Sequence, residues 1–134
     1  MLNRLVLSLA LSLALVSTGG CSSGRSIATD RAFDGPPITV RPIDEHQLLV
    51  VEAPTPGWTM RIDHIQRKLN HADVFVTMQR PDPGVLYAQV IVEQQLLTNV
   101  TLSRPVNVYA RTLAFGQTRK KPPYRLAAKS ELPE

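Results

Sequence analysis

The chain has 134 residues, of which 43% are hydrophobic and 19% are charged, and its formal net charge at pH 7 is +4. This length suits a single domain, and the composition is too apolar for a fully disordered chain. One cysteine and no internal repeat exclude a disulfide scaffold, a repeat array and most cysteine-ligated metalloproteins.

Residues 1–20 have the pattern of an export signal peptide. Arg4 gives the start a positive charge, residues 5–16 form a short apolar run, and small residues lead up to Cys21. The apolar run is too short for a stable transmembrane helix. The sequence therefore predicts a protein that is exported and then anchored or released, not one that spans a membrane.

The residues around Cys21 resemble the lipobox of bacterial lipoproteins. Gly19 and Gly20 are the small residues expected before the cysteine, while Thr18 stands where leucine is usual. The resemblance implies lipid attachment at Cys21 and anchoring by acyl chains such as palmitate, which is stable with two or three chains. Ser22, where aspartate would imply inner-membrane retention, favours the outer membrane or the cell surface.

Residues 21–36 are rich in Ser, Gly and Asp and predict a lipidated, flexible tether. Within residues 37–117, short segments rich in Val, Ile, Leu and Thr alternate with turn residues. The expected strands are residues 38–41, 46–53, 58–65, 73–80, 85–93, 96–102 and 105–115. About seven short strands predict an all-β fold, a small immunoglobulin-like β-sandwich.

Two proline-containing turns, residues 54–57 and 81–84, interrupt this series. Proline limits the freedom of the backbone, so both turns are expected to be preorganised. Trp58, the only tryptophan, suits either a core anchor or a binding platform beside the first turn. The candidate binding residues are Pro54, Pro56, Gly57, Trp58, Pro83 and Gly84.

Three segments, APTPGWTMRIDHI, VFVTMQRPDPG and AQVIVEQQLLTNVTL, resemble the C-terminal domain of protease-complex components of the PrcB type, a small sandwich of bacterial envelope proteins. The resemblance spans about residues 46–110, although Leu97 and Thr98 replace a stretch where the family often has proline. It implies a binding sandwich and supplies no catalytic residue. The matching residues are Pro56, Gly57, Trp58, Pro83 and Gly84.

No motif for catalysis, a metal or a cofactor is present. The chain lacks a nucleophile elbow and a glycine-rich phosphate loop, so we expect no enzyme, no cofactor, no metal site and no small-molecule substrate. Asp63 and His64 are adjacent on an expected strand and should therefore point to opposite faces. The acidic run that ends at His46 is interpreted as a solvated turn.

The positive charge is concentrated at the C-terminus. Residues 35–117 carry seven basic and seven acidic side chains, whereas residues 118–134 carry five basic and two acidic ones. We expect 118–134 to be a disordered basic tail, with Arg119, Lys120, Lys121 and Arg125 as its candidate contact residues. A neutral domain with a basic tail does not fit a nucleic-acid-binding face.

These observations lead to two functional hypotheses. The first is a non-enzymatic, lipid-anchored envelope protein whose sandwich binds another envelope protein, such as a protease or an assembly component, through its turns. The alternative is a structural surface protein whose basic tail associates with an anionic envelope polymer or with lipid.

Overall fold

The computed structural model describes residues 28–29 and 32–130 of the chain. The expected signal peptide, Cys21 and the first part of the expected tether lie outside these residues. Over the described part of the chain, no helix has the length and apolar character needed to cross a bilayer.

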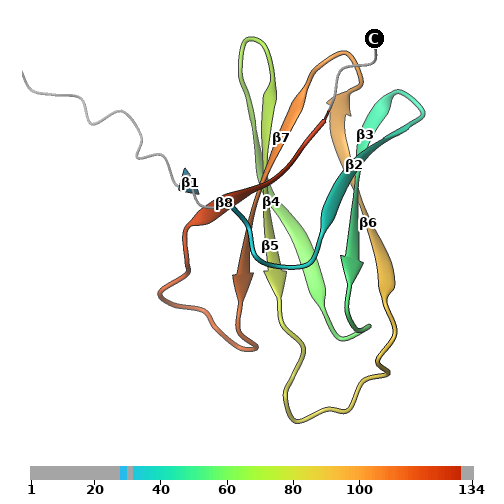
Figure 1. Ribbon diagram of the computed structural model, residues 1–134. Helices are drawn as coiled ribbons and strands as arrows, with labels where there is room; N and C mark the ends of the chain where they lie inside the picture. The colour runs from blue at the N-terminus through green and yellow to red at the C-terminus, as the bar shows by residue number, and fades with distance from the viewer. Residues whose placement is uncertain (1–27, 30–31, 131–134) are drawn as a thin grey trace, which may run out of the picture.

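The protein is a two-layer β-sandwich (Figure 1). Its strands are β1 (Ala28–Thr29), β2 (Ile38–Ile43), β3 (His46–Ala53), β4 (Thr59–Arg67), β5 (Ala72–Gln79), β6 (Val92–Thr101), β7 (Val106–Leu113) and β8 (Tyr124–Lys129). One sheet has the order β1-β8-β7-β5-β4 and the other the order β2-β3-β6. The predicted immunoglobulin-like sandwich of about seven strands is confirmed, and the described residues form no helix.

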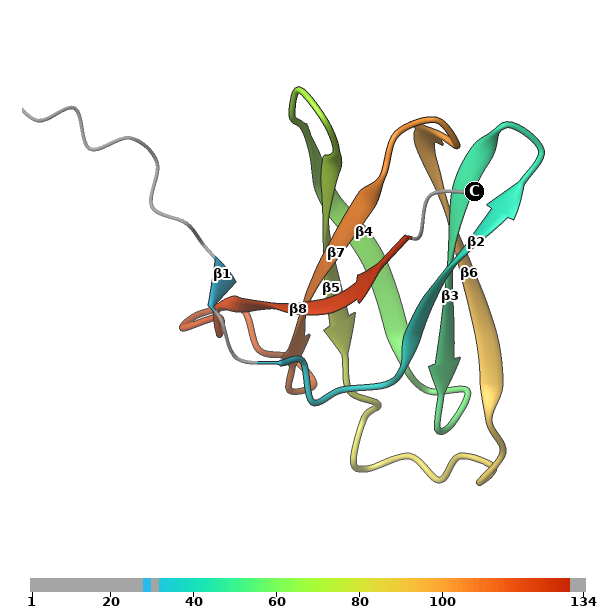
Figure 2. The same ribbon diagram turned by 45° about the horizontal axis from the view of Figure 1, so that its top comes forward.

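The strand connections place the ends of β5 and β7 side by side. These two strands are parallel, with Gln79 opposite Leu113. A parallel pair needs a crossover connection, and here the chain crosses to the other sheet, forms β6, and returns (Figure 2). The connections that follow β5 and β7 therefore leave the sandwich at the same end.

The core lies between the two sheets and consists of alternate residues of each strand. Such alternation is what a strand with one buried face requires. The fully buried side chains of the central strands include Leu49, Val51, Val74, Val76, Met78, Val106, Val108 and Ala110. Trp58 is half-buried at the edge of this cluster, so its expected role as a core anchor agrees with its position.

The expected strand over 85–93 is wrong for its first part. Residues 85–91 form an irregular connection, and β6 begins only at Val92. The reason is topological: β5 ends in one sheet and β6 begins in the other, so the chain must cross the end of the sandwich before it can pair again. The apolar residues of this segment resemble a strand in composition but remain exposed.

The expected disordered tail at 118–134 is also wrong over part of its length. Tyr124–Lys129 form β8, which pairs antiparallel with β7. Tyr124 is only 5% exposed because its side chain packs on the outer face of the larger sheet. The sandwich therefore extends beyond the expected boundary at residue 117.

The N-terminal boundary is likewise earlier than residue 37. Phe33 packs against the core, and its backbone N–H donates a hydrogen bond to Leu126 of β8 at 3.1 Å. Pro36 is buried. The segment that leads into β2 thus belongs to the domain and covers β8 from one side.

We predict that a chain ending at Gln117 is severely destabilised, because it lacks β8. Loss of a large buried aromatic side chain costs about 3–5 kcal/mol, and each kcal/mol shifts the thermal midpoint by about 4 °C or more in a domain of this size. Thermal unfolding followed by circular dichroism should show a midpoint at least about 10 °C lower than that of the full chain. A control ending at Ser130 keeps β8, and equal midpoints for all three chains would contradict the assignment of β8.

Candidate functional site

Three connections lie at one end of the sandwich, which we call the loop end: residues 54–58, 80–91 and 114–123. The first joins β3 to β4, the second crosses between the sheets, and the third joins β7 to β8. A hydrogen bond from the backbone N–H of Arg80 to the carbonyl of Leu113, 2.9 Å long, joins the second and third connections where they begin.

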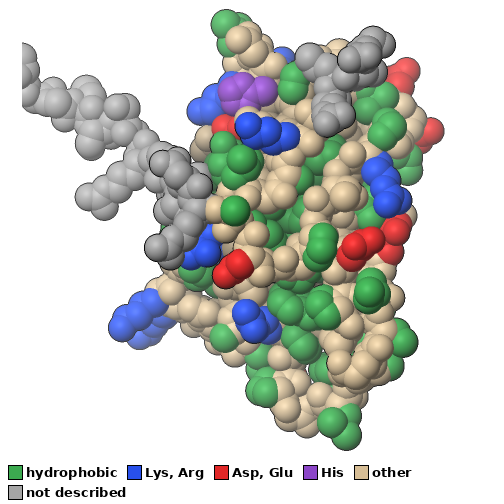
Figure 3. All heavy atoms as spheres, in the orientation of Figure 1, with side chains coloured by type: hydrophobic (Ala, Val, Ile, Leu, Met, Phe, Trp, Pro, Cys, Tyr) green, Lys and Arg blue, Asp and Glu red, His purple; other side chains and the backbone are tan. Residues whose placement is uncertain are grey.

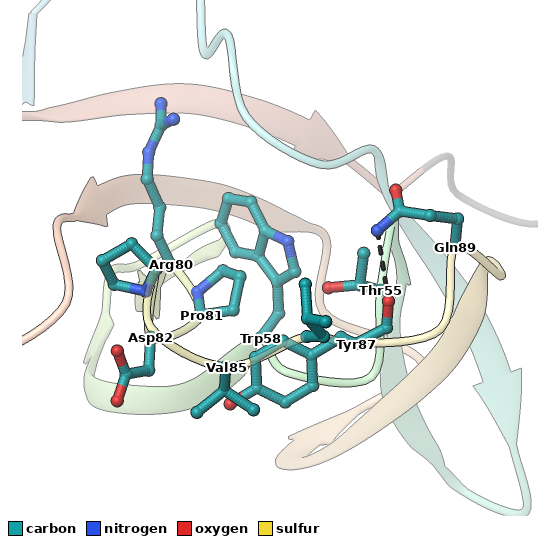
Figure 4. A pocket seen from close by; sticks show the side chains of 10 residues that line it. Thr55, Trp58, Arg80, Pro81, Asp82, Val85, Tyr87 and Gln89 are labelled. Atoms are coloured by element: carbon teal, nitrogen blue, oxygen red, sulfur yellow. Dashed lines mark hydrogen bonds between the residues drawn. The ribbon is translucent and has the colours of Figure 1, made fainter.

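The first two connections enclose a hollow of about 390 Å³, the Trp58 hollow (Figure 4). Its lining residues are Thr55, Trp58, Arg80, Pro81, Asp82, Pro83, Val85, Leu86, Tyr87 and Gln89. The indole of Trp58 lies in the middle of this group, between Arg80 and the ring of Tyr87. The expected binding turns are therefore neighbours in space, although more than 20 residues separate them in sequence.

A close approach at Gly57 holds the two connections together. A Cβ at this position would lie 2.7 Å from Pro81 Cβ and 2.7 Å from the Tyr87 ring, so no larger residue fits without movement. The Gln94 side chain donates to the carbonyl of Trp58 at 2.9 Å and fixes the start of β4 against β6. These two contacts hold the walls of the hollow against each other.

A second hollow, of about 210 Å³, lies on the other side of Arg80 and is called the Arg125 hollow. It is lined by Phe33, Asp34, Arg80, Ala110, Arg111, Thr112, Pro122, Pro123 and Arg125. Arg125 lies 3.6 Å from the Asp34 carboxylate. Arg80 lines both hollows and lies over Trp58, with 6.0 Å between the guanidinium carbon and the centre of the ring.

Each hollow contains one buried hydroxyl without a partner. Thr55 Oγ1 in the Trp58 hollow and Thr112 Oγ1 in the Arg125 hollow accept or donate no hydrogen bond to the described residues. A buried polar atom without a partner is costly. Both hydroxyl oxygens are buried in the walls of the hollows.

The basic run of the expected tail is an ordered connection. The Gln117 side chain donates to the carbonyl of Lys120 at 3.1 Å and accepts from the N–H of Ala114 at 2.9 Å. Lys120 has a left-handed backbone, with φ of 51°. Arg119, Lys120 and Lys121 are exposed at the loop end, whereas Arg125 belongs to β8 and lines a hollow.

The expected binding residues are only partly brought together. Trp58 and Pro83 line the Trp58 hollow. Gly57 does not line it but lies close to Pro81 and Tyr87, which do. Gly84 serves the turn itself, since its N–H donates to Asp82 Oδ1 at 2.8 Å. Two prolines, Pro54 and Pro56, are exposed and do not line the hollow.

Sequence reasoning missed Arg80 and residues 85–87 as lining residues. The apolar stretch 85–91 suits a strand by composition, and nothing in its pattern marks it as exposed. Its position directly after the 81–84 turn was the available signal, because this turn precedes the crossover between sheets.

The outer face of the larger sheet carries a second cluster, which corrects another expectation. The pairing of β4 with β5 shifts by one residue between Ile62 and His64, so Asp63 is the extra residue of a β-bulge. The Asp63 carboxylate accepts a hydrogen bond from the Thr77 hydroxyl, and the His64 ring stacks on that of Phe75 with 4.3 Å between ring centres. Thr77 and Phe75 share the outer face. The expectation that Asp63 and His64 point to opposite faces is therefore wrong.

The Asp63 carboxylate joins four strands. It accepts hydrogen bonds from the hydroxyls of Thr77 on β5 and of Tyr124 on β8, the latter at 2.6 Å. Arg61 Nε donates to its other oxygen at 3.0 Å. Arg111 on β7 lies 3.7 Å from Asp63, donates to Thr77 at 2.9 Å, and covers the Tyr124 ring at 4.3 Å.

These contacts shift two pKa values. Partial burial raises the pKa of Asp63, but the hydrogen bonds from Thr77 and Tyr124 and the charge of Arg61 outweigh burial, so the pKa lies below its ordinary value. Burial, together with the hydrogen bond to Asp63, raises the pKa of Tyr124. Both shifts favour the charged carboxylate and the neutral phenol, which is the pair that the hydrogen bond needs.

The Asp63 carboxylate receives its hydrogen bonds from members of its own cluster. The described residues contain no group of three or more His, Cys, Asp or Glu side chains that could hold a metal ion. The two hollows of the loop end are features suited to a ligand.

Comparison of the chain with protein-family models, with curated proteins and with solved structures finds no match.

We predict that Asp63→Asn lowers the free energy of unfolding at pH 7 by about 1.5–3 kcal/mol, the range for a hydrogen bond to a charged group. The lowered pKa in the folded state means that the charged carboxylate contributes stability above about pH 4, the ordinary value for Asp, and that this contribution is lost as the pH falls through the lowered pKa. Urea unfolding at pH 7 and near pH 3 should show the difference from the natural chain shrinking at low pH.

The control for this experiment is Glu52→Gln. Glu52 is exposed, and its carboxylate makes no hydrogen bond or ion pair to other described residues. Its substitution should change the stability by no more than about 0.5 kcal/mol. A difference for Asp63→Asn that is the same at both pH values would refute the role assigned to the Asp63 charge.

Proposed function

We propose that this chain is a lipid-anchored bacterial envelope protein that has no catalytic activity and binds another envelope protein through the loop end. The observation that supports protein binding is the concentration of exposed apolar side chains there. Of the eight large hydrophobic residues exposed in the described part of the chain, five belong to residues 85–91 or to Phe115.

These five residues are Val85, Leu86, Val90, Ile91 and Phe115. Figure 3 shows hydrophobic side chains gathered on the tip formed by residues 80–91. An exposed apolar patch next to a hollow is typical of a protein interface. The contacts that hold the walls of the hollow together lower the entropic cost of association.

The proposed anchor and the proposed interface are compatible. Lipid at Cys21 would hold the protein to a membrane. Cys21 precedes β1, which pairs with β8 of the larger sheet, and it is not part of the loop end. The resemblance to the PrcB-type domain supports a binding sandwich of a protease complex. We accordingly propose a component of such a complex, or of an assembly complex, as the partner class.

We predict that Leu86→Ser lowers capture of the protein partner by at least about tenfold, because burial of one leucine contributes about 1.5–3 kcal/mol. Leu86 is 101% exposed, so the substitution should leave the stability unchanged within about 0.5 kcal/mol. Capture is measured by crosslinking in intact envelopes, followed by affinity purification and mass spectrometry.

The matched control is Leu69→Ser. Leu69 is 94% exposed and lies in the turn between β4 and β5, at the opposite end of the sandwich. Equal losses of capture for the two variants, or no loss for either, would remove the loop end as the proposed interface.

A second candidate function is association with an anionic envelope polymer or lipid. It is favoured by the exposed cations Arg119, Lys120 and Lys121, which the Gln117 contacts hold on an ordered connection. Each basic residue near an anionic surface contributes about 1 kcal/mol. This binding would be weakened by salt.

We predict for this second function that changing Arg119, Lys120 and Lys121 to Gln abolishes salt-sensitive sedimentation with anionic vesicles. Three charges correspond to about 3 kcal/mol, or more than a hundredfold. The substitutions preserve β8, which deletion of the segment would remove. The double variant Lys68→Gln, Lys129→Gln removes charge at the opposite end and should sediment as the natural chain does. Unchanged sedimentation of the triple variant would reject this function.

A further inference from the structure

We propose that the loop end recognises a partner segment that carries an apolar side chain next to an acidic one. The apolar side chain occupies the Trp58 hollow, and the carboxylate pairs with Arg80. This inference depends on the proposed protein binding and specifies the chemistry of the partner.

The shape and lining of the Trp58 hollow select the apolar side chain. Trp58, Tyr87 and Pro81 face the hollow with flat apolar surfaces (Figure 4). The volume of about 390 Å³ lies within the range of ligand pockets in proteins and exceeds what one side chain fills. The hollow therefore accommodates one large apolar side chain together with the adjoining backbone of the partner.

The charges around the hollow select the acidic neighbour. The carboxylate of Asp82 accepts a hydrogen bond from the N–H of Gly84 within the same turn. The carboxylate of Asp34 pairs with Arg125. Arg80 has no ion pair with the described residues, and its contact with Trp58 holds the guanidinium at the boundary of the two hollows. A guanidinium in this position suits a carboxylate, which it binds with two parallel hydrogen bonds.

The exposed cations of the loop end favour an acidic partner over a purely apolar one. Arg119, Lys120 and Lys121 at the same end add a positive field that attracts an acidic segment.

The test is selection of random, tryptophan-free short peptides on the full chain in detergent, in parallel with the variants Arg80→Gln and Arg41→Gln. Arg41 is an exposed arginine of β2, away from both hollows; its substitution removes one positive charge and an exposed ion pair with Glu93 at 3.9 Å. Trp58 is the only tryptophan, so its fluorescence reports occupation of the hollow by each selected peptide.

We expect the natural chain and Arg41→Gln to enrich peptides with Asp or Glu beside Leu, Ile, Phe or Tyr, and these peptides to shift the Trp58 emission. With Arg80→Gln, the acidic preference should fall at least about tenfold while the apolar preference remains. Enriched peptides without an acidic residue, or an acidic preference that Arg80→Gln leaves unchanged, would overturn this inference and leave protein binding standing. Absence of any enrichment would also overturn it, and the Leu86→Ser capture experiment decides protein binding separately.

Discussion

The Asp63 carboxylate is the interaction on which the arrangement of the larger sheet depends. Its contacts reach Thr77, Arg111 and Tyr124, so one charged group connects β4, β5, β7 and β8 on the outer face. Asp63 lies on the same face as its partners because it alternates with the core residues Met60 and Ile62, and the bulge brings His64 to that face as well. Strand β8 in turn positions Arg125 and receives the backbone of Phe33. The network thus acts on the loop end indirectly, by holding in place the strand that forms one wall of the Arg125 hollow.

A second constraint, the parallel pairing of β5 and β7, explains why the candidate site lies at one end. The chain must leave the sheet after β5, pass through β6 in the other sheet, and return before it can form β7. The long connection 80–91 is the result, and its apolar residues cannot be buried while it crosses the open end of the sandwich. Pro81, Pro83 and Tyr87 restrict the conformation of this connection and pack it beside Trp58. A restricted surface loses less conformational entropy when it binds a partner.

Much of the fold could be predicted from the sequence, since strands with one buried face leave a period of two. β3 and β7 follow the expected ranges closely, and Val74, Val76 and Met78 are buried as their alternation indicates. The errors have specific causes. Local composition does not reveal that 85–91 must cross between sheets, that Tyr124 is buried beside Phe75, or that a bulge turns His64 outward, because each depends on contacts distant in sequence. Among the residues that line the Trp58 hollow, Trp58 and Pro83 were candidates from the sequence, whereas Arg80 and Tyr87 reach the hollow through contacts between connections that are distant in sequence.

The central claim is that the loop end is the surface by which this protein binds its partner. Hydrogen–deuterium exchange of the lipidated protein, compared between intact envelopes and the purified state, tests it most directly. We expect slower exchange in the envelope for residues 54–58 and 80–91, and no change in the turn between β4 and β5. Slower exchange at that turn or along β6, with the loop end unchanged, would contradict the claim.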